Sequence, residues 1–315
     1  MNFKGVIKGL HHITATVNDA QEDYDFYTKI LGQRLIKETV NFDNENVYHF
    51  YYGNEVGSPS TIFTTFPYKG QGVRDGVIGS GQVFETVFSV SSGSLSFWEE
   101  RLKNKGVKFS KVAYFGNDKL QFQDPSGLKL AIIEDASDER QPVWKTDDIS
   151  VEKNIIGIHH VVLAIENVEE TSRFLEIFGY SQTKADGDFT LFESELGGAG
   201  NSLAVMDAKD LPKGKNGLGT VHHVAHRVEK VEDSIKIRDY VVKEFGVKAT
   251  EVKDRKYFES IYFRIPGGVL FEIATEGPGF TIDETKEELG SSLKLPDWQE
   301  PHRERIEKGL LKYER

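Results

Sequence analysis

Three pairs of adjacent histidines stand near the start of three similar apolar stretches. The pairs lie in GLHHITATV (9–17), GIHHVVLAI (157–165) and TVHHVAHRV (220–228), and they hold six of the nine histidines of the chain. Imidazole is a common metal ligand and the side chain best suited to proton transfer near neutral pH. We therefore expect at least one pair to take part in metal binding or acid–base chemistry.

The alternation of side chains along a strand predicts which member of each pair faces a cleft. Neighbouring residues of a strand point to opposite faces. His12 would then share a face with Leu10 and Thr14, whereas His11 would share the other face with apolar residues only. The first face is more polar and suits a solvated cleft. By the same alternation, the second histidine also faces the cleft in the other two pairs, as His160 and His223.

A single carboxylate interrupts the apolar stretch GGVLFEIAT (267–275). Burying the ionised side chain of Glu272 there is costly unless it is paired or binds a metal. Two imidazoles and one carboxylate in one cleft are the ligand set of many non-haem Fe(II) oxygenases, and this set leaves coordination positions open. The alternative is that the histidines are ordinary core residues and that Glu272 pairs with a lysine. The combination of residue types favours a metal site.

The elements that must position these side chains form a fourfold repeat. QVFETVFSV (82–90) resembles the histidine strands but has Glu85 where they have their second histidine. Helical patterns that end in glycine follow the four strands, at 19–32, 94–106, 168–179 and 231–246. Apolar strands close the units, at 60–66, 127–134, 201–207 and 268–275. We predict an α+β fold of four βαβββ modules, paired into two curved-sheet domains that enclose clefts.

The repeat divides the chain into four parts. We assign 1–135 to an N-terminal pair of modules, 136–154 to a polar linker, 155–276 to a C-terminal pair and 277–315 to a tail. One module alone carries a carboxylate on its closing strand, at Glu272. The aligned positions of the other modules hold Thr64, Ala131 and Ala204. One metal site per chain is therefore expected.

Composition excludes several classes of protein. The formal net charge of −11 disfavours nucleic acid as a partner, because an acidic surface repels phosphate. The chain has no cysteine, so disulfides, thiolate nucleophiles and cysteine-bound zinc are excluded. We see no apolar run long enough to span a membrane and no signal peptide, and we expect a cytoplasmic protein without a membrane partner.

Two segments resemble one family. DRKYFESIYFRIPGGVLFEIATEGPGF (254–280) and LKLPDWQEPHRERIE (293–307) are similar to the ring-cleaving dioxygenases that open para-hydroquinones. That group belongs to the vicinal oxygen chelate superfamily, together with glyoxalase I, fosfomycin-resistance proteins and extradiol dioxygenases. The resemblance implies ferrous iron, with Mn(II) as the alternative. It also implies that the ligands of this metal ion are His12, His223 and Glu272.

The resemblance also implies residues around the metal. Tyr262 and Arg255 would act on the substrate, and His11 and His222 adjoin the ligands. Tyr262 lies on the strand face opposite to its apolar neighbours, so its hydroxyl could bind a phenolate oxygen. The guanidinium of Arg255 could offset the phenolate charge. Alternation turns His11 and His222 away from the cleft, so support of the ligand strands is their expected role.

His12 and His160 compete for one ligand position. If the third and fourth modules form the cleft, His160 joins His223 and Glu272, as in catechol-cleaving extradiol enzymes. Sequence neighbours pair more often than distant units, which favours His160. Against this, the face of His12 carries two threonines and is more polar. The para-hydroquinone group also uses its first module. We therefore predict His12, with His160 as the alternative ligand.

The resulting hypothesis is an Fe(II)-dependent dioxygenase that opens a hydroquinone-type ring with O₂. Its partners would be a small aromatic substrate and O₂, and assembly into a homo-oligomer stays open. Three other functions are kept: a catechol extradiol dioxygenase, a glyoxalase-like metal-dependent isomerase or lyase, and a protein that binds an aromatic compound without turnover. A glyoxalase-like enzyme usually needs a fourth protein ligand, and oxygen uptake separates these functions.

Overall fold

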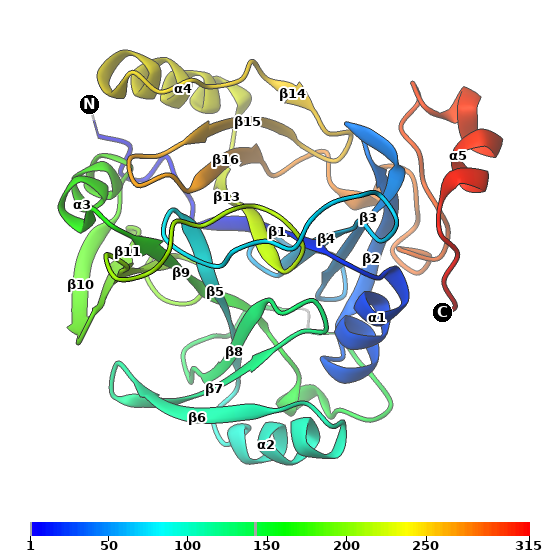
Figure 1. The fold of residues 1–315 in the computed structure, drawn as a ribbon, viewed down its shortest axis with the longest axis horizontal. Coiled ribbons are helices and arrows are strands. Elements are labelled where there is room, and N and C mark those ends of the chain that lie inside the picture. The colour runs from blue at the N-terminus through cyan, green and yellow to red at the C-terminus, as the bar shows by residue number, and fades with distance from the viewer. Residues whose placement is uncertain (1, 142–143) are drawn as a thin grey trace.

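Two curved sheets of eight strands each make up the body of the protein (Figure 1). The computed structural model describes residues 2–141 and 144–315. The first sheet has, in spatial order, β14 (Lys253–Asp254), β15 (Glu259–Arg264), β16 (Leu270–Thr275), β13 (Thr220–Val228), β1 (Leu10–Val17), β4 (Ile62–Pro67), β3 (Asn44–Gly53) and β2 (Arg34–Asn41). The second has β10 (Ser181–Asp186), β11 (Phe189–Glu193), β12 (Ser202–Asp207), β9 (Gly157–Ile165), β5 (Gln82–Val90), β8 (Lys129–Glu134), β7 (Asn117–Gln123) and β6 (Phe109–Tyr114).

Each sheet joins one module from each half of the chain. β1 of the first module pairs antiparallel with β13 of the fourth, and β5 of the second pairs antiparallel with β9 of the third. The α+β fold of paired βαβββ modules is thereby confirmed. The division into 1–135, 136–154, 155–276 and 277–315 stays a prediction, and residues 142–143 of the predicted linker lie outside the described part of the chain.

The first helix of each module packs on the face of its sheet that looks away from the cleft. The helices are α1 (Ala20–Asp25, continued by a π-helical turn, Phe26–Ile30), α2 (Leu95–Asn104), α3 (Val168–Ile177) and α4 (Val231–Phe245). They lie where the glycine-terminated patterns predict them. Gly246, for example, ends α4 with a φ of 62°, which favours glycine. No helix in the described ranges is long and apolar enough to cross a membrane.

A β-bulge lies at the first residue of every histidine pair. Leu10 pairs with His226 and His12 pairs with Ala225, so His11 is an extra residue in β1. The same irregularity makes an extra residue of His222 in β13, and of Phe84 and His159 in the second sheet. A bulge interrupts the alternation of side chains and re-aims them.

The bulges correct our prediction from alternation. We expected His11 and His12 to point to opposite faces, but their Nδ1 atoms lie 2.9 Å apart. The second and third pairs repeat this contact, at 2.7 and 2.8 Å. Leu10, which we placed on the face of His12, is in fact part of the core. The bulge thus brings both imidazoles of each pair together on one side of the strand.

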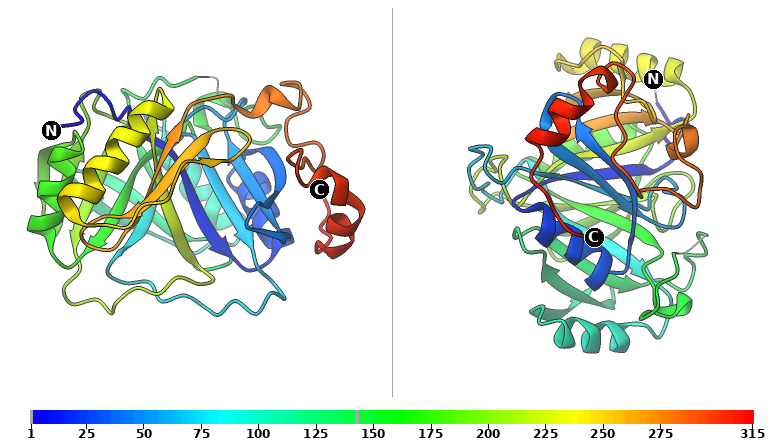
Figure 2. Two further views of the ribbon diagram at one scale, coloured as in Figure 1. Left: turned by 90° about the horizontal axis from the view of Figure 1, so that it is seen from above. Right: turned by 90° about the vertical axis from the view of Figure 1, so that its right-hand side faces the viewer.

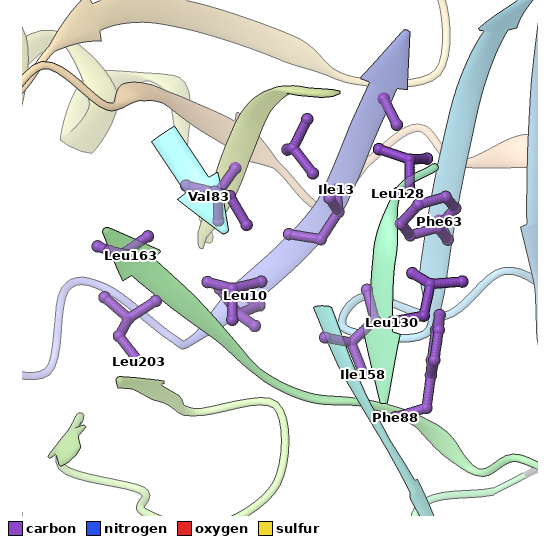
Figure 3. Close-up of a cluster of buried hydrophobic side chains, with 14 of the residues drawn as sticks. Leu10, Ile13, Phe63, Val83, Phe88, Leu128, Leu130, Ile158, Leu163 and Leu203 are labelled. Atoms are coloured by element: carbon purple, nitrogen blue, oxygen red, sulfur yellow. The ribbon is translucent and has the colours of Figure 1, made fainter. Parts of the chain in front are cut away.

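The main hydrophobic core fills the space between the two sheets (Figure 3). Leu10, Ile13 and Phe63 come from the first sheet, and their neighbours Phe88 and Leu163 come from the second. All five are fully buried. This core joins one face of each sheet to the other sheet, so the opposite face of each sheet is free to form a cleft.

The segment after β16 runs along the edge of the first sheet and ends in α5 (Arg303–Gly309) (Figure 2). The fully buried ammonium of Lys37, on the edge strand β2, binds the carbonyl of Phe280 at 3.0 Å and Asp283 at 2.6 Å, and it also contacts Glu284. The segment thus covers an edge that would otherwise be open to pairing with another chain.

Candidate metal centre

Three neighbouring strands in the middle of the first sheet bring His12, His223 and Glu272 together. β1, β13 and β16 lie side by side, and their register places His12 and Glu272 on either side of Ala225. The potential ligand atoms of the three side chains lie within 4.8 Å of one another. The pairing of the first module with the fourth is what places His12, rather than His160, at this point. As metal ligands the three residues remain a prediction.

The carboxylate of Glu272 is fully buried between the two imidazoles. Its Oε2 lies 2.8 Å from Nε2 of His223 and 3.3 Å from Nε2 of His12, and the two Nε2 atoms are 3.2 Å apart. Neither carboxylate oxygen has a hydrogen-bond partner of good geometry among the described residues. A buried carboxylate without well-formed hydrogen bonds is costly, and a cation would satisfy it. The residues present therefore fit a metal ion.

The surroundings of Glu272 favour the ionised form of its carboxylate. Burial by itself would raise the pKa of Glu272, but the adjoining imidazoles of His12 and His223 hold that pKa well below its usual range. Burial lowers the pKa of His223, which favours the neutral imidazole that a metal needs. Among the described residues, no other group of three or more His, Asp or Glu side chains has this arrangement.

The first histidine of each pair holds the second through its Nδ1 atom. The Nδ1 atoms of His11 and His12 are 2.9 Å apart, and those of His222 and His223 are 2.8 Å apart. Burial lowers the pKa of both His11 and His222 to about 3, so both are neutral. A neutral imidazole accepts a hydrogen bond at one nitrogen, so each can accept the Nδ1 proton of its neighbour.

A cavity of about 330 Å³ opens beside His12 and His223. His12 and His223 line its floor, and its walls include the aromatic side chains of Phe42, Phe66 and Phe258. The volume suits a ligand of about one aromatic ring. His222 also lines this cavity, so our prediction that alternation turns it away is wrong, and the bulge at His222 is the reason.

Tyr262 and Arg255 form one polar wall of the cavity. Tyr262 pairs with Glu272 in the strand register, and its ring centroid lies 5.6 Å from that of His223. Its hydroxyl oxygen accepts hydrogen bonds from Nε of Arg255 and from the hydroxyl of Ser260, each at 3.1 Å. Burial is the main cause that raises the pKa of the Tyr262 hydroxyl, which therefore keeps its proton.

Arg255 is held inside the cavity mouth. Its side chain is 16% exposed, and its Nη2 lies 3.2 Å from the carboxylate of Asp43, on the turn between β2 and β3. Its guanidinium also lies 5.2 Å from the ring centroid of Tyr262. Arg255 is thus not a freely solvated surface cation. The role of Asp43 was missed, because nothing in the sequence relates that turn to residue 255.

His160 lies in the second sheet, away from Glu272. Its Nε2 contacts the hydroxyl of Tyr114 at 2.9 Å, and its Nδ1 contacts His159. Beside it, Glu85 forms a buried ion pair of 2.6 Å with Lys119. The corresponding place in this sheet therefore holds a lysine ammonium near the histidine and lacks the carboxylate of the fourth module.

His49 is a cavity residue that the sequence analysis missed. It lies on β3, and its Nε2 is 2.9 Å from the hydroxyl of Thr64. Its position in VYHFYY, two residues before Tyr51 on an aromatic strand, was the signal that could have drawn attention to it. Burial is the main cause that lowers its pKa well below the usual range, so the imidazole is neutral.

Comparison with known proteins gives the family. The model of the glyoxalase/bleomycin resistance protein/dioxygenase superfamily matches residues 9–132 and 157–273. The chain therefore belongs to this superfamily, as the sequence resemblance predicts. With glyoxalase I from Zea mays it shares the fold, at a TM-score of 0.63 and 16% identity, over 85% of this chain and 92% of that one.

Nearer relatives cover almost the whole chain. MhqO of Bacillus subtilis (strain 168), provisionally named a ring-cleaving dioxygenase, is 44% identical over 97% of this chain and 96% of its own. A chlorohydroquinone/hydroquinone 1,2-dioxygenase of Sphingobium indicum is 37% identical over 92% and 91% of the two chains. A crystal structure from Bacillus subtilis, provisionally named a dioxygenase, is 43% identical, with a TM-score of 0.93 over 98% of each chain.

Proposed function

We propose that this protein is a ring-cleaving dioxygenase that uses Fe(II) and O₂ to open a hydroquinone-type aromatic ring. The observation that carries the proposal is the buried group of His12, His223 and Glu272, whose two histidines line an aromatic cavity. The names of the two relatives support it, since both are called dioxygenases and one acts on hydroquinones.

His12, His223 and Glu272 would hold the iron. Two neutral imidazoles and one carboxylate are typical ligands of Fe(II) in oxygenases and leave coordination positions open. When bound, the iron would supply adjacent positions for a phenolic oxygen and for O₂, and a path for electrons between them. Mn(II) accepts similar ligands and is the alternative cation.

His11 and His222 would keep the ligand rings in the correct orientation and protonation state. A ligand that binds metal through Nε2 carries its proton on Nδ1. The Nδ1–Nδ1 distances of 2.9 and 2.8 Å let His12 donate to His11 and His223 donate to His222. Such partners commonly strengthen metal binding by fixing the ligand.

Tyr262 would bind the substrate oxygen, and Arg255 would balance its charge. Because Arg255 and Ser260 both donate to the hydroxyl oxygen of Tyr262, the proton of that hydroxyl is left for an acceptor in the cavity. A phenolate oxygen at the floor of the cavity is such an acceptor. The fixed positive charge of Arg255 lowers the free energy of the anion in this poorly solvated site.

The test is oxygen uptake by protein reconstituted anaerobically with Fe(II), across matched para-hydroquinones and catechols. The proposal predicts uptake with hydroquinones and loss of uptake in Glu272→Gln, which removes the charge but keeps the shape. Uptake confined to catechols would favour the extradiol alternative. Isomerase or lyase activity without uptake would favour a glyoxalase-like enzyme, and binding without turnover would favour a binding protein.

A further inference from the structure

His49 lies on the side of the cavity away from Tyr262. The strand order β15-β16-β13-β1-β4-β3 places the three strands of the metal centre between β15, which carries Tyr262, and the pair β4 and β3. Both Tyr262 and His49 line the same cavity. A ring that lies over the metal centre thus has one polar wall near β15 and a second at His49.

Contacts on several sides hold the imidazole of His49 in one orientation. Its ring centroid lies 4.1 Å from that of Tyr51 and 4.2 Å from that of Phe66. Its Nε2 lies 2.9 Å from the hydroxyl of Thr64, which is itself 2.8 Å from the hydroxyl of Thr14. A side chain fixed in this way loses little entropy when a ligand binds it.

The other ring nitrogen of His49 is available. Within residues 2–141 and 144–315, Nδ1 of His49 has no hydrogen-bond partner, while its Nε2 is bonded to Thr64. If Nε2 donates to Thr64, Nδ1 is an acceptor, and if Nε2 accepts, Nδ1 is a donor. A phenolic hydroxyl can both donate and accept, so it pairs with Nδ1 in either tautomer.

A para-hydroquinone needs such a partner. When one of its oxygens lies at the metal centre, the second lies across the ring, inside an aromatic cavity. A buried hydroxyl without a hydrogen bond costs roughly 5- to 100-fold in binding. A catechol has both oxygens on the same side and does not need a group there.

We propose that His49 is a specificity-determining residue that hydrogen-bonds the substrate hydroxyl farthest from the metal centre. This inference rests on the proposed function for the orientation of the ring. Tyr51 is the rival, because it also lines the cavity and its hydroxyl has no hydrogen-bond partner within the described ranges. His49 is favoured because Tyr51 is only 1% exposed, whereas His49 is only partly buried.

The test is a binding cycle without turnover. Calorimetry under argon, on Mn(II)-loaded protein, would measure the affinities of hydroquinone and of phenol, which lacks the second hydroxyl. Wild type should prefer hydroquinone by roughly 5-fold or more. His49→Phe keeps an aromatic ring and should bring this preference close to one, with little change in phenol binding. Thr64 keeps Thr14 as a partner in that variant.

Two further variants make the result decisive. Tyr51→Phe is the matched control and should leave the preference unchanged. His49→Gln restores a polar group and should recover part of the preference, which a mere packing role would not predict. The proposal would be overturned if wild type bound hydroquinone and phenol equally well. It would also be overturned if His49→Phe weakened the binding of both ligands equally, or if Tyr51→Phe alone lost the preference for hydroquinone. Because no O₂ is present, a failure of ring cleavage would not affect this result.

Discussion

His11 offers the sharpest test of how the metal centre is supported. His11→Phe keeps a ring that can pack against Phe258, whose centroid lies 5.0 Å from that of His11, but it removes the nitrogen 2.9 Å from Nδ1 of His12. Loss of such a partner typically weakens metal binding 10- to 100-fold, or by about 1.4 to 2.7 kcal/mol. The Nδ1 proton of His12 would also be left buried without an acceptor.

The second sheet provides a matched control for this prediction. His159 makes the same Nδ1 contact with His160, at 2.7 Å, but among the described residues this pair belongs to no group of three potential metal ligands. Competition with a chromophoric chelator under argon would compare Fe(II) affinities. His11→Phe should weaken binding by the stated factor, and His159→Phe should not. Equal affinities in the two variants would refute the supporting role of His11.

Three other changes give direct tests. Tyr262→Phe should keep the metal but lower turnover about 100-fold or more, because one hydroxyl proton is lost. Arg255→Ala should raise the apparent KM for the substrate, and an unchanged KM would place its charge outside the reaction. The third change, Asp23→Asn, tests how stability depends on pH, because burial raises the pKa of Asp23 from 3.8 to about 8.

The raised pKa of Asp23 gives a stability change of known sign. Between these two pKa values the folded chain keeps the proton of Asp23, whereas the unfolded chain loses it. The contribution of Asp23 to the free energy of unfolding therefore falls as the pH rises from the lower value to the higher. Asp23→Asn removes the effect. In urea denaturation, the free energy of unfolding of the variant should rise relative to that of wild type by up to about 1.4 kcal/mol per pH unit between about pH 5 and 7. A difference in unfolding free energy that does not change with pH would contradict the raised pKa of Asp23.

The repeat made much of the fold predictable. Four similar strands, each followed by a glycine-terminated helix, were visible because each module repeats the same local pattern. Which modules share a sheet was not visible, because pairing depends on contacts between residues far apart in the chain, such as His12 with Ala225. The sequence therefore left His12 and His160 as rivals, and the pairing of β1 with β13 brings His12 to Glu272.

The bulges and the far wall of the cavity explain what was missed. A strict period of two has no place for an extra residue, so it separated His11 from His12, which are in contact. The motif around His49 could draw attention to it, but its place in the cavity follows only once β3 is known to lie two strands from β1. Neither the register of a bulge nor the order of strands follows from local residue preferences.

The central claim is that His12, His223 and Glu272 bind one metal ion. The most direct measurement is the iron content of wild type, His12→Ala and His160→Ala after identical anaerobic reconstitution with Fe(II) and removal of free metal. We predict about one iron per chain in wild type and in His160→Ala, and little in His12→Ala. Full iron content in His12→Ala, or loss of iron in His160→Ala alone, would contradict the account.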